Sequence, residues 1–159
     1  MGETLSFVVR RMTNASNDAL WHVLGDFGTE HRWTKSLDHC ERDTDIVDVG
    51  TIRTCKLPRA LMGRTTVREE LTQYEPGRAL AYRLEGPAGP FASAASRWST
   101  SPGWDGGTVM CVEGFFTARN RAARILVWPP VKPMLRRLTS RVMAELEGFV
   151  VGQSNNLRS

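Results

Sequence analysis

The sequence predicts an α+β fold in which a curved antiparallel sheet of seven strands wraps around a long C-terminal helix, with two short helices after the first strand. Three observations carry this prediction. Stretches rich in β-branched and aromatic residues alternate with short turns containing Gly, Pro or Asp, which is typical of hairpin-connected strands. A short apolar segment with helical spacing follows the first stretch, and a much longer one closes the chain.

The first elements are a strand and a short helix. Residues 4–11 are rich in β-branched and aromatic side chains and lead into Thr13-Asn14, a turn-like pair that ends the strand. Ser16 is a good N-cap residue, and the apolar residues that follow it have helical spacing, which predicts a helix over 17–25. Since Gly25 and Gly28 interrupt this pattern, a second short helical turn is expected only around 29–33.

Six further strands follow in a meander. They are expected over residues 37–43, 51–57, 64–74, 78–85, 92–100 and 108–118. The links between them are short and contain Gly, Pro or Asp, which favours antiparallel hairpins over crossover connections.

The last element is a helix that begins at a group of prolines. Pro129, Pro130 and Pro133 indicate a helix start, where proline is tolerated. An apolar stripe then recurs at helical spacing through Leu135, Leu138, Val142, Leu146 and Phe149. Such a helix must bury its stripe, and the concave face of the sheet is the partner available for it.

Composition places the chain among ordinary globular proteins. Its 159 residues are 41% hydrophobic and 24% charged, enough for one domain with a core. Residues 1–11 lack the pattern of a secretory signal peptide. The three cysteines are odd in number and form no CxxC pair, so we expect reduced thiols and a cytoplasmic location.

Charge is distributed unevenly along the chain. Residues 26–48 hold seven acids, and residues 119–141 hold seven bases without an acid. The basic segment is either a solvated helix face or a surface for weak contact with an anionic membrane, where Ile125 to Trp128 would add apolar contacts. No nucleic-acid-binding motif accompanies it, so we expect no nucleic-acid partner.

Small residues in the strand over 92–100 suggest a hollow between sheet and helix. One alternating set reads Ala92, Ala94, Ser96, Trp98 and Thr100. Small side chains beside Trp98, Met110 and Phe116 suit the wall of an apolar cavity. The alternative is that these small residues only let the helix approach closely.

Several segments resemble one known family in order and spacing. They are Ala15 to Trp21, Asp26-Phe27, Trp33, Val49 to Cys55, Val67 to Leu71, Glu75 to Tyr82, Gly107 to Val109 and Trp128 to Leu135. Together they resemble the polyketide cyclase/dehydrase branch of the START-like (SRPBCC) superfamily, over about Ser6 to Phe149. One departure is the run of Ala and Ser over 92–96, where many relatives carry an aromatic or charged residue.

The resemblance implies a helix-grip fold with an internal cavity, and a single START-like ligand-binding domain over 1–159. Members of the family cyclise or dehydrate polyketide chains, or bind and carry lipids, hormones and other apolar ligands. We therefore expect binding of a small apolar or aromatic molecule, with catalysis of a cyclisation or dehydration left open against a non-catalytic carrier. A peripheral-membrane protein that uses the basic segment is a third reading.

Three residues are candidates for catalysis. Arg53 and Glu69 lie on strands joined by one hairpin and can pair across it, either to orient a ligand or as a structural ion pair. Glu70 competes with Glu69, because a shift of one residue reverses the face. Tyr82 alternates with Leu80 and Leu84, so its hydroxyl is expected inside.

The remaining predictions concern the ligand and the absence of cofactors. The candidate ligand-binding residues are Phe27, Trp33, Ala94, Ser96, Trp98, Met110, Val112, Phe116, Leu138 and Val142. Among them Trp33 falls on the helical corner, either as a gate or as a stacking surface, and a histidine such as His31 beside it is more often incidental than catalytic. We expect no metal and no cofactor, since His22, His31 and His39 form no recognisable ligand set and no phosphate loop or nucleophile motif is present.

Overall fold

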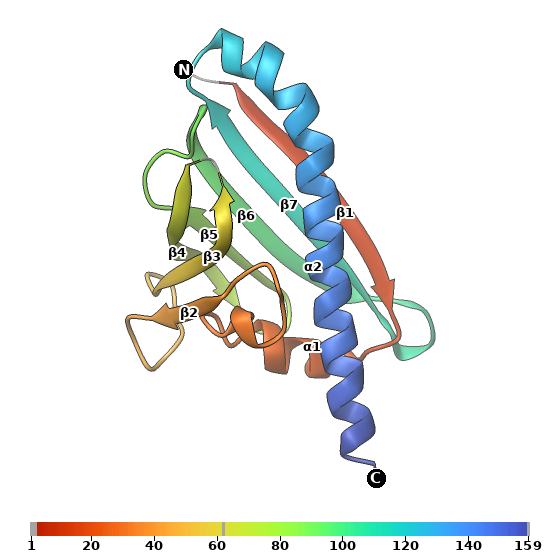
Figure 1. Ribbon diagram of the computed structural model, residues 1–159. Helices are drawn as coiled ribbons and strands as arrows, with labels where there is room; N and C mark the ends of the chain where they lie inside the picture. The colour runs from red at the N-terminus through yellow and green to blue at the C-terminus, as the bar shows by residue number, and fades with distance from the viewer. Residues whose placement is uncertain (1–2, 62, 159) are drawn as a thin grey trace.

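The computed structural model describes residues 3–61 and 63–158. It contains a seven-stranded sheet in the order β1-β7-β6-β5-β4-β3-β2, in which every neighbouring pair is antiparallel. The long helix α2 (Trp128–Asn156) crosses the curved sheet on one side (Figure 1). The predicted α+β helix-grip architecture, with its seven strands and closing helix, is confirmed.

The strands match the predicted ones closely, and their ends differ by a few residues. They are β1 (Thr4–Thr13), β2 (His39–Arg42), β3 (Ile52–Leu61), β4 (Arg64–Glu75), β5 (Ala79–Leu84), β6 (Phe91–Pro102) and β7 (Thr108–Ala118). The largest difference is in β3, which runs to residue 61 rather than 57. It extends further because Leu61 pairs with Arg64 directly across the turn.

Strand β1 reaches the last strand of the meander rather than the next one in sequence. It pairs with β7 over its whole length, from Thr4 opposite Thr117 to Thr13 opposite Thr108. Strands β1 and β2 are therefore the two edges of the sheet. The chain between these edges, residues 14–38, forms the corner with the two short helices.

Helix α1 (Asn17–Leu24) begins where the sequence predicts. The Ser16 hydroxyl accepts a hydrogen bond of 3.2 Å from the Ala19 N–H, which satisfies one of the free donors of the first turn. The inward face of the helix is buried through Leu20, Trp21 and Leu24. A 3₁₀ turn, η1 (Glu30–Arg32), follows and carries the chain across the end of the sheet.

The start of α2 differs in detail from the prediction. A π-helical turn, η3 (Ala123–Val127), leads directly into it, and this turn has no clear signal in the sequence. Proline at the first helical positions is tolerated because those N–H groups have no partner within the helix.

A further 3₁₀ turn between β6 and β7, η2 (Trp104–Gly106), was also not predicted.

Two hydrophobic clusters pack the two ends of the molecule. The larger one joins α1, the sheet and the C-terminal half of α2, and includes Phe27, Leu71 and Met143. The smaller one lies at the start of α2 and consists of Phe7, Phe91, Trp128 and Leu135. The apolar stripe of α2 is divided accordingly, since Leu135 and Leu146 are buried whereas Leu138 and Val142 are only half-buried.

Candidate ligand-binding site

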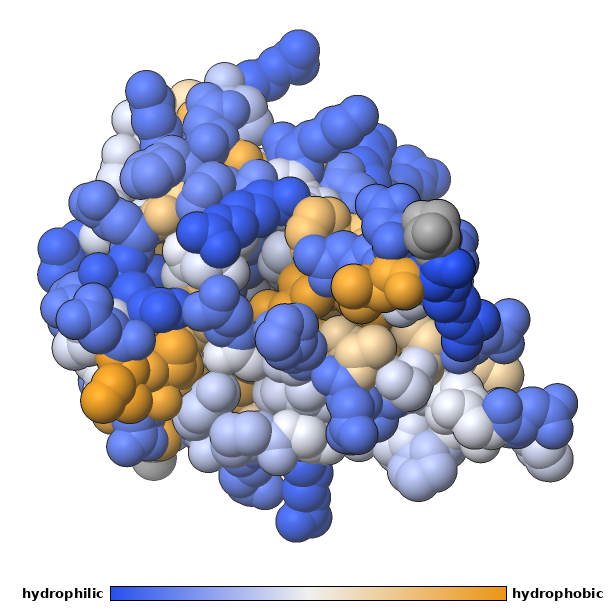
Figure 2. All heavy atoms as spheres, turned by 90° about the horizontal axis from the view of Figure 1, so that it is seen from below, coloured by the Kyte–Doolittle hydropathy of each residue, from blue (hydrophilic) through white to orange (hydrophobic). Residues whose placement is uncertain are grey.

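A pocket of about 1120 Å³ lies between α2 and the sheet. Its wall includes members of both hydrophobic clusters, such as Leu80 and Trp98 of the larger one and Leu135 of the smaller. The pocket therefore separates the two packed ends. On the face of the molecule shown in Figure 2, one group of hydrophobic residues lies between hydrophilic side chains near the centre, and a second group lies at the surface near the edge of the view.

Small side chains on β6 leave room in the middle of the pocket. Ala94 and Ser96 lie on its wall, and their partners across the β6–β7 ladder are Phe116 and Gly114. The Phe7 ring covers Gly114 so closely that an added Cβ would lie 2.2 Å from it. Ala92, the first residue of the predicted alternating set, is exposed because the β6–β7 register shifts between Phe91 and Ser93.

The predicted ligand-binding residues fall into two groups. Seven lie on the pocket wall: Trp33, Ala94, Ser96, Trp98, Phe116, Leu138 and Val142. Three lie instead in the larger hydrophobic cluster: Phe27, Met110 and Val112. These three side chains are 0–2% exposed, so they are buried within the cluster and do not line the pocket.

At the end of the pocket that is furthest from solvent, the deep end, four side chains surround the guanidinium of Arg53. Its guanidinium forms ion pairs with Glu30 at 2.5 Å and with Glu69 at 2.7 Å. The rings of Phe27 and Tyr82 lie against it, with centroids 4.4 Å and 4.3 Å from Cζ and 5.8 Å from each other. Burial alone would lower the pKa of Arg53, but the two carboxylates outweigh it and raise the pKa above its usual value.

The three predicted catalytic residues all line the pocket, but their contacts leave them with different roles. All three nitrogens of the Arg53 guanidinium are paired with Glu30 or Glu69, so its main role is to hold these carboxylates in place. The Tyr82 hydroxyl accepts a hydrogen bond of 3.4 Å from Trp98 Nε1, which leaves its own proton available for donation. Of these three residues, Glu69 and Tyr82 are therefore the ones that can exchange a proton with a bound molecule.

The register of the β3–β4 hairpin decides between Glu69 and Glu70. Arg53 lies directly opposite Glu69, and Ile52 lies opposite Glu70. Glu70 points to the other face of the sheet, where it pairs with Arg83 at 2.7 Å. Glu69 is therefore the pocket-facing carboxylate.

Glu30 is a member of this cluster that the sequence did not reveal. It is 8% exposed, and both of its carboxylate oxygens accept hydrogen bonds from the Gly28 N–H. It comes from the turn η1, far from β3 in sequence. An acid beside helical turns is ordinarily solvated, so no local signal marks it as a partner of Arg53.

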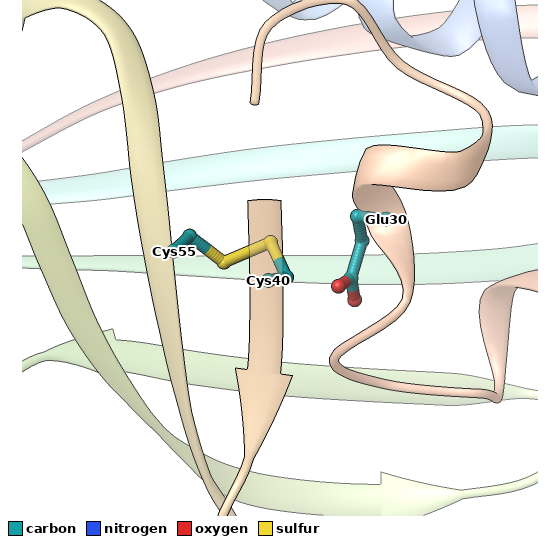
Figure 3. A group of neighbouring side chains, drawn as sticks. All are labelled: Glu30, Cys40 and Cys55. Atoms are coloured by element: carbon teal, nitrogen blue, oxygen red, sulfur yellow. A yellow bond between two sulfur atoms is a disulfide. The ribbon is translucent and has the colours of Figure 1, made fainter. Parts of the chain in front are cut away.

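The expectation of reduced thiols is wrong for two of the three cysteines. Cys40 and Cys55 face each other across β2 and β3 with Cα atoms 4.2 Å apart, and they form a disulfide (Figure 3). Spacing in the sequence did not indicate this pair because cross-strand proximity depends on the register of two strands. Cys111 remains free.

Glu30 lies beside this disulfide, as Figure 3 shows. One ligand atom from each of Glu30, Cys40 and Cys55 falls within 4.8 Å of the others, a spacing that suits a metal ion. However, the two sulfurs are bonded to each other, and Glu30 is engaged by Arg53 and Gly28. In this state the three residues offer no set of free ligands.

His31 has a structural contact rather than a place on the pocket wall. Its Nδ1 accepts a hydrogen bond of 3.1 Å from the Cys40 N–H, which requires that this nitrogen be unprotonated. Burial, and then the neighbouring His39, lower the pKa of His31. The neutral ring thus ties the corner to the edge strand β2.

The fold and the pocket together define the class: a helix-grip protein with a ligand-sized hollow between its sheet and its closing helix. The chain belongs to the family described as polyketide cyclase / dehydrase and lipid transport, whose model matches residues 4–148.

A similar solved structure is that of Ara h 8.0201, with a TM-score of 0.75 and 14% sequence identity, covering 94% of this chain and 99% of that one. At that identity the likeness concerns the fold alone. No curated protein matches the sequence. Among residues 3–61 and 63–158, no helix is long and apolar enough to cross a membrane.

Proposed function

We propose that the chain is a single ligand-binding domain that holds a small apolar or aromatic molecule in the pocket between α2 and the sheet. The observation that carries this proposal is the hollow itself, about 1120 Å³ in volume, which is slightly larger than the roughly 300–1,000 Å³ of typical small-molecule sites. Its wall combines aliphatic and aromatic side chains, such as Leu138 and Trp98, with polar and charged groups at both ends. Membership of a family that includes lipid transport supports the same reading.

Native mass spectrometry of freshly purified protein tests this proposal. We expect a fraction of the protein to carry a co-purified apolar molecule, seen as a discrete added mass that is lost on denaturation. Protein that is free of any adduct, and that also fails to take up a neutral apolar dye such as Nile red, would contradict the proposal.

A second candidate function is acid–base catalysis on the bound molecule, favoured by the positions of Glu69 and Tyr82. A carboxylate and a phenol on one wall can remove a proton beside a carbonyl and return it to an oxygen. These are the steps of an intramolecular aldol cyclisation followed by loss of one water. The enclosing pocket would fold the chain so that its carbonyls meet.

Two substitutions distinguish an enzyme from a non-catalytic carrier. If the protein is an enzyme, Glu69→Gln and Tyr82→Phe abolish ring formation from a linear poly-β-ketone, followed by ultraviolet absorbance, while Nile red binding persists. If it is a carrier, wild-type protein forms no product, and the two substitutions alter affinity only.

Contact with anionic membranes is a further candidate, favoured by the surface of η3. Ile125 is 50% and Leu126 is 71% exposed there, beside the exposed bases Arg119 and Arg121. Apolar side chains flanked by cations suit an anionic bilayer surface. Co-sedimentation with phosphatidylglycerol vesicles that disappears at high salt would support this reading, and its absence at low salt would contradict it.

The cytoplasmic location expected from the sequence stays a prediction. The disulfide between Cys40 and Cys55 weighs against it, because disulfides persist mainly in oxidising compartments. Cell fractionation of the full-length protein decides the question.

A further inference from the structure

The mouth of the pocket is strongly cationic. Pocket-lining residues that are themselves exposed mark the opening, and they include Lys35 on the loop after η1, Arg59 on β3, and Arg137 and Arg141 on α2. Arg64 on β4 is half-buried beside them. These five side chains form what we call the basic rim, and they come from three separate parts of the chain.

The charges of the basic rim are hardly neutralised by neighbouring carboxylates. Among the described residues, none of its five cations forms an ion pair with a carboxylate. Arg64 donates only to the backbone carbonyls of Glu85 and Pro87. The one acid among the lining residues at the mouth, Glu145, is engaged by the Thr34 hydroxyl and the Lys35 backbone N–H.

The deep end of the pocket has the opposite balance. There a single guanidinium, that of Arg53, is shared by two carboxyl groups, Glu30 and Glu69. An anionic group would meet excess acid at the deep end and excess cation at the mouth. Because a pocket wall of low dielectric strengthens such differences, the arrangement would orient a ligand with one charged end.

We infer that the ligand is an amphipathic anion, whose apolar body enters the pocket and whose carboxylate or phosphate group stays at the basic rim. This inference rests on the proposed function, since it names the chemical class of the molecule that the pocket holds. Arg137 and Arg141 lie one helical turn apart on α2, so both guanidinium groups can reach one anion.

A matched set of amphiphiles tests the inference. Dodecanoate, dodecan-1-ol and dodecylammonium share one apolar body and differ in the charge of one end, and their affinities are measured by displacement of Nile red below the micellar concentration. We expect dodecanoate to bind about tenfold or more tightly than dodecan-1-ol at low salt, as charge-assisted hydrogen bonds imply. We expect this preference to shrink at high salt and dodecylammonium to bind least tightly.

Substitution at the rim locates the effect. In Arg137→Gln/Arg141→Gln the preference for dodecanoate should fall to within about twofold, while the affinity for dodecan-1-ol stays unchanged. The control Arg121→Gln/Arg136→Gln removes the same charge from exposed positions outside the pocket wall and should keep the preference. Circular dichroism verifies that both variants are folded, and the salt dependence of the wild type tests the inference without any variant.

The outcomes separate the two proposals. Equal binding of dodecanoate and dodecan-1-ol by the wild type would overturn the inference and leave the proposed function standing. A preference that survives in Arg137→Gln/Arg141→Gln would also overturn it. In that case, if the variant loses binding to phosphatidylglycerol vesicles, the rim serves bilayer head groups rather than a free ligand. Displacement of Nile red by none of the three amphiphiles would overturn the inference and leave the proposed function standing, because the bound dye itself shows that the pocket takes an apolar molecule.

Discussion

At the level of single residues, Arg53 organises the polar end of the pocket. Its pairing with Glu69 could be anticipated from the sequence, because one hairpin places the two residues opposite each other. Its enclosure by Glu30, Phe27 and Tyr82 could not, because those contacts depend on how the corner and β5 meet β3. A guanidinium satisfied in this way acts on a ligand only through the residues it positions.

Replacing Arg53 should therefore be costly for stability. Arg53→Met leaves two largely buried carboxylates without their cation, and we expect a loss of about 3–5 kcal/mol in the free energy of unfolding, measured by urea denaturation. The control Arg83→Met breaks the exposed pair with Glu70 and should cost about 1 kcal/mol or less. Equal losses in the two variants would show that the Arg53 cluster is not a buried network.

Trp33 offers a second test at this level. Its indole Nε1 is buried without a hydrogen-bond partner among the described residues, whereas Trp21 Nε1 donates to the Thr100 hydroxyl at 2.7 Å. Phe keeps an aromatic ring at either position and removes the N–H. We expect Trp21→Phe to lose about 1–2 kcal/mol more unfolding free energy than Trp33→Phe, because only Trp21→Phe gives up a satisfied bond.

Urea denaturation of both variants checks this expectation. The loss of ring volume is the same in the two proteins, so it largely cancels in the comparison. A larger loss in Trp33→Phe would mean that its N–H is satisfied in solution.

At the level of elements, turn residues and hydrophobic periodicity predicted the strands and helices. They did not predict features that depend on contacts between distant segments. Gly- and Pro-containing links predicted all six strands of the meander. Pro129 and Pro130 fall in the first turn of α2 as predicted, whereas Pro133 lies inside the helix. The π-helical turn η3 and the disulfide escaped prediction. Both depend on where the segments are placed by the rest of the fold, which local composition does not encode.

The disulfide should stabilise the edge strand β2, which is only four residues long. It joins cysteines 15 residues apart, and closing such a loop in the unfolded chain typically contributes about 2–4 kcal/mol. We expect Cys40→Ser/Cys55→Ser to lower the free energy of unfolding by that amount in urea. Addition of reductant should have the same effect on the wild type and no further effect on the variant.

Cys111 provides the control for this prediction. It is free and lies on β7, away from the β2–β3 pair. Cys111→Ser should retain the sensitivity of stability to reductant. A wild-type protein whose stability is indifferent to reductant would contradict the prediction.

At the scale of the whole molecule, the two hydrophobic clusters pack α2 against the sheet near Trp128 and Leu135 and again from Met143 onwards, and Leu138 and Arg141 between them line the pocket. The small residues at Ala94 and Ser96 hinted at this hollow, but the sequence left open whether the helix would fill it. The structure differs from that alternative because Leu138 and Val142 line the same pocket as Ala94 and Ser96. The distribution of charge between mouth and deep end is likewise a property of the assembled fold.

The most direct test of this account fills the hollow. Ser96→Trp adds a large side chain to the pocket wall, and Ser99→Trp adds the same side chain to β6 outside it. Binding of Nile red, a neutral apolar probe, is measured by fluorescence titration of both variants and the wild type after circular dichroism has verified their folding. We expect one site per chain in the wild type and in Ser99→Trp. In Ser96→Trp we expect at least tenfold weaker binding, because the added side chain excludes apolar contacts of the ligand. Undiminished binding in a folded Ser96→Trp protein would contradict this account.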